Sequence, residues 1–202
     1  MSPASPHPTI YSIGHSNHSL EVFLELLRLH AIDAVADVRS QPYSRYSPHF
    51  SREALAAAFE REEIRYVFLG QELGGRPQDD EFYDDEGHVL YGHLAVSEQF
   101  LTGIERLEAG ALRLRVAIMC SEEDPLHCHR RLLVARVLEQ RGTEVRHIRR
   151  DGRVEHEGDL RSRENGSEAV SLSLFGEESA DQPWRSIRSV SRARPLPSSS
   201  VR

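Results

Sequence analysis

Short apolar runs alternate with amphipathic segments over the first three quarters of the chain, and this alternation constrains the fold more than any other feature. Five runs carry the β-branched and aromatic residues of buried strands, at 9–13, 34–38, 65–69, 114–119 and 144–148. Between two of them, apolar residues recur at helical spacing at Leu20, Phe23, Leu24 and Leu27. Further helices are expected over 51–62, 95–108 and 129–141. Strands alternating with helices predict a single three-layer α/β domain with a mainly parallel sheet flanked by helices.

The two ends of the chain differ from this middle part in composition. Residues 1–8 are rich in Ser and Pro, and after about residue 158 Ser, Arg, Glu and Pro dominate. We therefore expect an α/β domain over 9–158, a disordered N-terminus over 1–8 and a disordered tail over 159–202. Within the domain, Asp151-Gly152 predicts a tight hairpin turn. Residues 71–92 are polar and show no periodicity, which predicts a long surface loop, here called the excursion. Loops of this length more often have a function than none.

Composition narrows the classes of protein to consider. The formal charge of −7 argues against a protein that coats nucleic acid through a basic surface, although it leaves room for a local basic cleft. No stretch approaches the roughly 20 apolar residues of a membrane span, and no secretory segment begins the chain. We expect a soluble, cytoplasmic protein without a membrane partner, whose two cysteines are reduced thiols.

Polar segments follow the carboxyl ends of the predicted strands, where open parallel sheets bind their ligands. In the first three of these segments His15 and Asp37 are candidates for proton transfer. The candidates for substrate binding there are Asn17, Arg39, Tyr43, Arg45, Gly74, Gly75 and Arg76. Arginines clamp phosphates and a tyrosine stacks on a base. The alternatives are that Arg39 pairs with Asp37, and that His15 is a hydrogen-bonded structural residue.

The fourth segment holds both cysteines of the chain. Cys120 ends a strand and Cys128 begins a helix, whose free N–H groups and dipole favour an anion and lower the pKa of a thiol. Either cysteine is then a candidate nucleophile, with His129 and Glu122 as further catalytic candidates and Arg130 holding an oxyanion. Cys120 is alternatively a small buried residue. A zinc site is a third possibility, but its Cys-x7-Cys spacing is unusual, so no metal or other cofactor is expected.

Six motifs in order carry a resemblance to a known family. They are Ile13–Asn17, Asp37–Ser40, Glu72–Gly75, Met119–Glu122, Cys128–Arg130 and Val145–Ile148. Together they resemble the bacterial and archaeal family called domain of unknown function 488, over about residues 9–150. The resemblance implies an α/β fold with an enzymatic pocket. It implies no particular reaction, because none is established for the family. The positions to which it points are Arg39, Cys120, Glu122, Cys128, His129 and Arg130, and Ser121 departs from the Ala expected beside them.

A looser similarity is to rhodanese-like and Cys-phosphatase domains, which also place a cysteine loop between a strand and a helix. It implies a Rossmann-like or rhodanese-like arrangement of the three layers. Ten residues separate Cys120 from Arg130. This exceeds the Cys-x5-Arg cradle of those enzymes, so their mechanism does not carry over.

An apolar island interrupts the polar tail. Ser171–Phe175 is similar to the peptide by which repair proteins dock on the bacterial sliding clamp, with Ser171 in place of the usual Gln. Leu172, Leu174 and Phe175 would then enter a groove of that partner. The alternative is a strand that folds back on the domain. Arginines near the end of the chain would add attraction to phosphate or simply aid solubility.

The hypothesis that joins these observations is an enzyme acting on a phosphate-bearing substrate, either nucleic acid or a nucleotide. Its reaction would be thiol-dependent transfer or phosphoester hydrolysis. An alternative is a non-catalytic module that binds nucleic acid or a nucleotide and is recruited through its tail. A second alternative is a metal-binding protein with Cys and His ligands.

Overall fold

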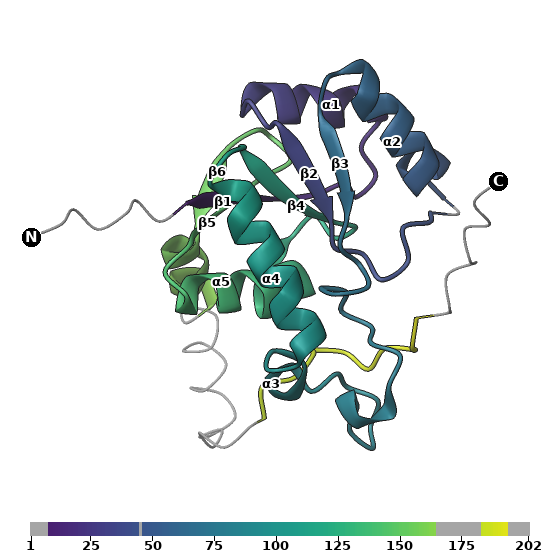
Figure 1. The fold of residues 1–202 in the computed structure, drawn as a ribbon, viewed down its shortest axis with the longest axis vertical. Helices are drawn as coiled ribbons and strands as arrows, with labels where there is room; N and C mark the ends of the chain where they lie inside the picture. The colour runs from purple at the N-terminus through teal and green to yellow at the C-terminus, as the bar shows by residue number, and fades with distance from the viewer. Residues whose placement is uncertain (1–7, 45, 165–182, 194–202) are drawn as a thin grey trace, which may run out of the picture.

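A computed structural model describes residues 8–44, 46–164 and 183–193, and within them one six-stranded sheet forms the centre of the molecule (Figure 1). Its strands are β1 Thr9–Gly14, β2 Ala34–Asp37, β3 Arg65–Phe68, β4 Val116–Cys120, β5 Glu144–Ile148 and β6 Val154–His156. Their order is β3-β2-β4-β1-β5-β6. The first five are parallel, as predicted, and β6 runs antiparallel to β5 after the predicted turn at Asp151-Gly152, where Gly152 has a φ of +80°.

Helices follow the strands along the chain. The longer ones are α1 Leu20–Leu29, α2 Arg52–Arg61, α4 Glu98–Ala111, and the π-helix η4 Arg130–Ala135 that continues into α5 Arg136–Gln140. The short ones are η1 Pro48–Phe50, η2 Asp80–Phe82, α3 Tyr91–Leu94 and η3 Pro125–His127. The predicted start of α4 was three residues early. Ala95 and Val96 form a turn after α3, and the Ser97 hydroxyl then caps α4 by accepting a hydrogen bond from the Phe100 N–H.

Side chains that alternate along each strand divide the core into two halves. Ala36 and Ile118 face α4 and α5, whereas Val35 and Met119 face α1 and α2. In Figure 1, α1 and α2 lie together at the top of the view, and α4 and α5 lie in its lower half. The expected three-layer arrangement is confirmed.

Three adjacent strands end at one edge of the sheet and bring the candidate residues together. β4 lies between β2 and β1, with Asp37 opposite Met119 and Cys120 opposite Gly14. A Cβ atom at Gly14 would lie 1.8 Å from the carbonyl oxygen of Glu122. Only glycine at this position lets the loop that follows β4 lie directly on the end of β1.

Two parts of the expected disordered tail take defined positions. Residues 157–164 are helical, and residues 183–193, here called the C-terminal strap, lie on the domain. Hydrogen bonds join the strap to the excursion, from Ser186 N–H to Val89 O and from Val190 N–H to Gly87 O. These hydrogen bonds place the strap beside residues 87–89. Within the described ranges, no helix is long and apolar enough to cross a membrane.

Replacing Gly14 with Ala should lower the free energy of unfolding by about 3 kcal/mol, because the new methyl group overlaps backbone that cannot move away cheaply. Gly92→Ala is the matched control, since a Cβ there meets nothing within 4 Å. Urea denaturation of both variants measures the difference. Equal stabilities would show that the loop after β4 does not rest on β1.

Candidate functional site

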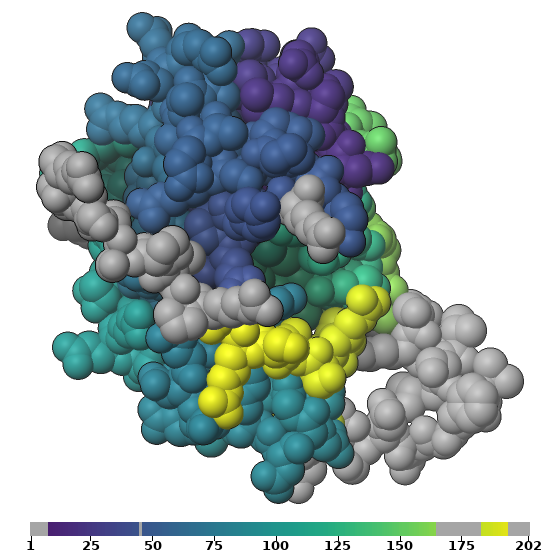
Figure 2. Space-filling model, turned by 90° about the vertical axis from the view of Figure 1, so that its right-hand side faces the viewer, coloured from purple at the N-terminus to yellow at the C-terminus, as the bar shows by residue number. Residues whose placement is uncertain are grey.

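A cavity of about 520 Å³ opens at the carboxyl edge of β2 and β4. Its lining includes Arg39, Ser40, Tyr43, Gly75, Arg76, Tyr91, Cys120, Glu122, Asp124, His127, Cys128 and His129, together with residues 186–190 of the strap. Figure 2 shows the hollow, with the yellow strap along its lower side and the blue segment that follows β2 above it. The volume is within the range of small-molecule sites.

Two thiols and an imidazole meet on one wall of this cavity. The Nδ1 atom of His129 lies 3.7 Å from the Cys120 sulfur and 4.0 Å from the Cys128 sulfur. Its Nε2 lies 3.0 Å from the carbonyl oxygen of Val38 and must donate the hydrogen to it, because a carbonyl only accepts. In the neutral ring this leaves the lone pair of Nδ1 directed at both sulfurs. The three atoms can exchange a proton or bind a common partner.

Gly75 holds the ring of His129 in this position. A Cβ atom at Gly75 would lie 2.6 Å from the His129 Cγ. Gly74 is equally confined, since its Cβ would lie 2.4 Å from the Ser40 hydroxyl. The two glycines were predicted to let a ligand approach the backbone. Their closest neighbours are protein atoms, so they act by allowing the loop to pack against His129 and Ser40.

Arg130 lies under the cluster and does not line the cavity. Its side chain is fully buried, and its guanidinium donates to the carbonyl oxygens of Glu122 and Glu123 and, at 3.0 Å, to the Ser12 hydroxyl. Among the described residues it has no carboxylate partner. The expectation that Arg130 holds the substrate's oxyanion is therefore corrected, because its donors hold the loop after β4 instead. Its charge still acts on the nearby thiols.

The two thiols differ in acidity. Burial raises the pKa of Cys128, but a hydrogen bond from the Cys120 thiol and the charge of Arg130 outweigh it and hold that pKa below its ordinary value. The pKa of Cys120 is raised, first because its thiol donates to the Cys128 sulfur and then by burial. Cys128 is thus the sulfur that ionises first, and Cys120 supports it as a donor.

Asp37 and Arg39 form a buried ion pair at the end of β2. Arg39 donates to both carboxylate oxygens of Asp37 at 2.8 and 2.6 Å, and the Tyr66 hydroxyl donates to the same carboxylate at 2.7 Å. Asp37 is completely buried and was expected to act as a base. Its oxygens are already occupied, so its role here is to orient Arg39, which reaches the cavity with one edge.

His15 is also engaged on both ring nitrogens. Nδ1 donates to the Ser16 carbonyl at 3.0 Å, Nε2 accepts from Arg39 at 3.1 Å, and the ring stacks on Phe50 with centroids 4.3 Å apart. Burial and the charge of Arg39 lower its pKa to about 4. The structure favours the alternative that His15 is a hydrogen-bonded structural residue over a role in proton transfer, because neither ring nitrogen is free to take a proton from a substrate.

A buried polar network behind Arg130 was missed at the sequence level. The Ser12 hydroxyl donates to His147 Nδ1 at 2.9 Å, and His147 Nε2 donates to Glu157 at 3.1 Å. Glu157 also pairs with Arg131. The signal available in the sequence was a serine and a histidine within otherwise apolar strands, at positions that the parallel register of β1 and β5 sets opposite each other.

The remaining predicted residues fall into three groups. Arg76 and Glu122 are exposed, line the cavity and have no ion pair with another described residue. Tyr43 also lines it and is 73% exposed, whereas Asn17 is exposed and lies outside the lining. Arg45 and the tail residues Leu172, Leu174 and Phe175 lie outside the described residues.

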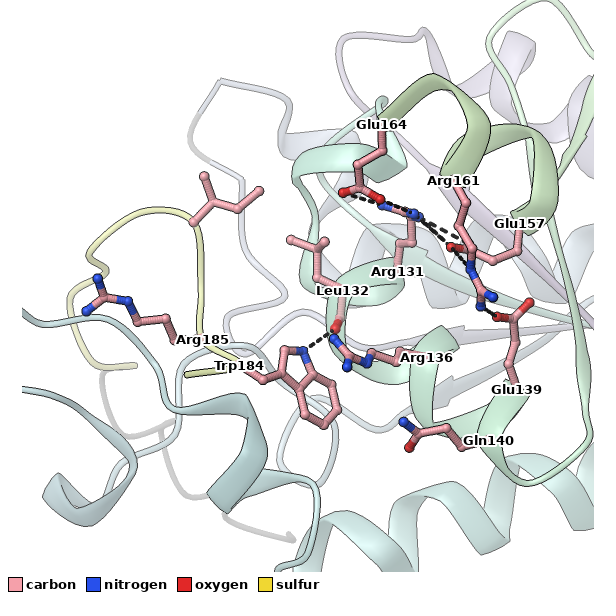
Figure 3. A pocket seen from close by; sticks show the side chains of 11 residues that line it. Arg131, Leu132, Arg136, Glu139, Gln140, Glu157, Arg161, Glu164, Trp184 and Arg185 are labelled. Atoms are coloured by element: carbon pink, nitrogen blue, oxygen red, sulfur yellow. Dashed lines mark hydrogen bonds and ion pairs between the residues drawn. The ribbon is translucent and has the colours of Figure 1, made fainter. Parts of the chain in front are cut away.

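A second cavity, of about 600 Å³, lies on the far side of η4 (Figure 3). Its lining includes Arg131, Arg136, Arg161 and Trp184. Arg131 pairs with Glu157 and Glu164, and Arg161 pairs with Glu139. Figure 3 shows these pairs, and Arg136 lies 4.3 Å from the centroid of the Trp184 ring. Most arginines that line the second cavity are paired with glutamates, so this cavity is a weaker anion site than the first one.

A comparison with known protein families identifies the family of the chain. The family described as "Domain of unknown function DUF488" matches residues 19–137. The chain belongs to the DUF488 family. No curated protein and no solved structure matches the chain. The DUF488 match includes Arg39, Cys120, Cys128 and His129, and it leaves out Ser12, His147 and the strap.

His15 predicts a loss of stability in acid. Its folded pKa of about 4 is below the ordinary 6.5, so between these values the unfolded chain binds more protons and stability falls as pH falls. From pH 7.5 to 4.5 this one residue should account for about 2 kcal/mol of lost stability. Urea denaturation at both pH values checks it. The loss should be smaller by that amount in His15→Gln, whose amide oxygen can still accept from Arg39, and an unchanged loss would contradict it.

Proposed function

We propose that this protein is an enzyme that uses the Cys128 thiolate on a phosphate-bearing substrate bound in the cavity at the sheet edge. The observation that carries the proposal is the convergence of both thiols on His129 Nδ1, beside the buried charge of Arg130. A thiol placed between a base and a fixed cation is the usual arrangement of an activated cysteine nucleophile.

Charges around the cavity favour an anionic substrate. Arg76 and Arg188 are exposed side chains of the lining, and neither forms an ion pair with another described residue. Arg39 adds a buried guanidinium group to the same lining. Unpaired guanidinium groups are well suited to phosphate oxygens, which accept paired N–H donors.

The chemistry follows from the positions of the side chains. The Cys128 sulfur attacks the phosphorus or another electrophilic centre of the substrate, forming a bond to sulfur while the bond to the leaving group breaks. The leaving group takes up the proton that His129 Nδ1 accepted from the Cys128 thiol. Water or an acceptor hydroxyl then displaces the sulfur and gives its proton to His129, which completes hydrolysis or transfer and restores the Cys128 thiolate.

Alkylation of metal-free protein at a series of pH values tests the proposal directly. Mass spectrometry should find Cys128 reacting with iodoacetamide with a midpoint below the ordinary value of about 8.5, and Cys120 with a midpoint above it. Cys120→Ala removes the donor to the Cys128 sulfur and should raise the Cys128 midpoint. Turnover of an aryl phosphate should fall about 100-fold in Cys128→Ser. A Cys128 midpoint at or above 8.5 would refute the thiolate nucleophile.

The same three atoms favour a second candidate, a thiophilic metal centre. Ligands of a tetrahedral zinc ion lie roughly 3.5 to 3.8 Å apart, given bonds of about 2.3 Å to sulfur and about 2.0 Å to nitrogen. The distances of 3.7 and 4.0 Å from His129 Nδ1 to the two sulfurs are close to this. The bond from His129 Nε2 to the Val38 carbonyl is the outer contact typical of a metal-bound histidine. Cys120, Cys128 and His129 would hold the ion, and its fourth position would face the cavity.

Metal analysis separates the two candidates. If the centre is metallic, protein loaded with Zn²⁺ and dialysed should retain about one ion per chain, and Cys120→Ala, Cys128→Ala and His129→Ala should each lose it. His127→Ala is the control, because His127 lines the cavity outside the three-atom cluster. Retention of zinc by all three ligand variants, or no retention by the wild type, would contradict a metal centre.

A further inference from the structure

The C-terminal strap forms one wall of the cavity and is held in place on both sides of it. Leu90 and Arg185 form an antiparallel bridge, and Val89 N–H donates to the Ser186 hydroxyl at 2.9 Å. The Trp184 indole N–H donates to the Leu132 carbonyl at 2.9 Å. On the far side, Val190 N–H donates to Gly87 O. Residues 186–190, from the Ser186 anchor to the Val190 anchor, are the part of the strap that lines the cavity.

The arginines of the strap differ in their partners. Arg185 pairs with Asp84 and Glu86, and Arg192 pairs with Asp80 and lies over the ring of Tyr83. Arg188 forms no ion pair with a described residue and lines the cavity together with Arg76. Two of these three charges are therefore neutralised on the excursion, whereas the third is available to whatever enters the cavity.

The position of the strap also limits the size of that ligand. A strand of nucleic acid needs an open groove in which the backbone can continue on both sides. Here the strap borders the hollow along one side, as Figure 2 shows, and the volume of the cavity is about 520 Å³. A cavity of this size fits a small molecule and not a polymer segment.

We propose that Arg188 of the strap, together with Arg76, binds the phosphate of a small phosphomonoester, of nucleotide size or smaller, and that the strap excludes nucleic acid strands. This rests on the proposed function, since it assigns the substrate class of the same cavity. Because residues 183–193 lie outside the family match, the specificity is supplied by a part of the chain that the family pattern does not cover.

Calorimetry tests the assignment without depending on thiol reactivity. The titrants are inorganic phosphate, adenosine 5′-monophosphate and a single-stranded 12-nucleotide DNA without terminal phosphate, each at fixed salt and pH 7.5. The full-length wild type should bind phosphate and the monophosphate and should not bind the oligonucleotide measurably. Arg188→Gln should weaken binding of the monophosphate at least 10-fold, the effect of losing one charge-assisted contact.

Arg192→Gln is the matched control, because it removes the same charge from the same strap at a residue that faces the excursion. Its affinity for the monophosphate should stay within twofold of the wild type. Equal losses in both variants, no loss in Arg188→Gln, no monophosphate binding by the wild type, or oligonucleotide binding as tight as that of the monophosphate would each overturn the assignment. Failure of the thiol proposal is distinguishable, because alkylation of Cys128 and binding of the monophosphate are separate measurements, and a Cys128 midpoint at or above about 8.5 would leave the expected effect of Arg188→Gln unchanged.

Discussion

Arg130 carries a full positive charge into the interior, where a cation without a partner is costly. Its three nitrogen atoms donate to two carbonyl oxygens and one hydroxyl, and no carboxylate among the described residues balances it. These contacts join three parts of the chain, namely the helix that begins at the site, the loop after β4 and the first strand. Because the charge is fixed and left unneutralised, it remains available to stabilise a nearby anion. The acidity of Cys128, the position of the loop and the buried network behind them all depend on this one group.

The other arginines near the site divide into structural and available ones. Arg39 is held by both oxygens of Asp37, and Arg131 is held between Glu157 and Glu164. Each of these pairs orders the strand or helix that bears it. Arg76 and Arg188 face the cavity without such a partner in the described part of the chain. An acidic protein with a net charge of −7 can thus still present a local cationic surface to a small anion, since its carboxylates neutralise the arginines elsewhere.

The architecture and the location of the site follow from patterns that are local in sequence. Strands with apolar runs, helices with apolar stripes and a turn at Asp151-Gly152 identify the sheet, and the rule for carboxyl ends identifies the edge. The roles of individual residues do not follow in this way. Asp37 and Arg39, two apart in an extended chain, share a face, and their pairing was one of the alternatives predicted from the sequence. Ser12 and His147 are opposite each other only because β1 and β5 are neighbours. The strap's position depends on contacts with residues about 100 positions earlier, which no local pattern records.

The π-helix η4 has a consequence for how the site is tied to the core. A π turn holds more residues than an α turn, so it changes the phase between the segment before it and the segment after it. Here the following segment, α5, places Val137 and Leu138 in the core, while the preceding residues Cys128 and His129 line the cavity. If one residue were deleted from η4, the helix could become a regular α-helix and α5 could keep its packing in the core. The residues before the deletion would then be turned about the helix axis by about 100°. The π turn thus fixes the angle between the residues that pack in the core and the residues that line the cavity.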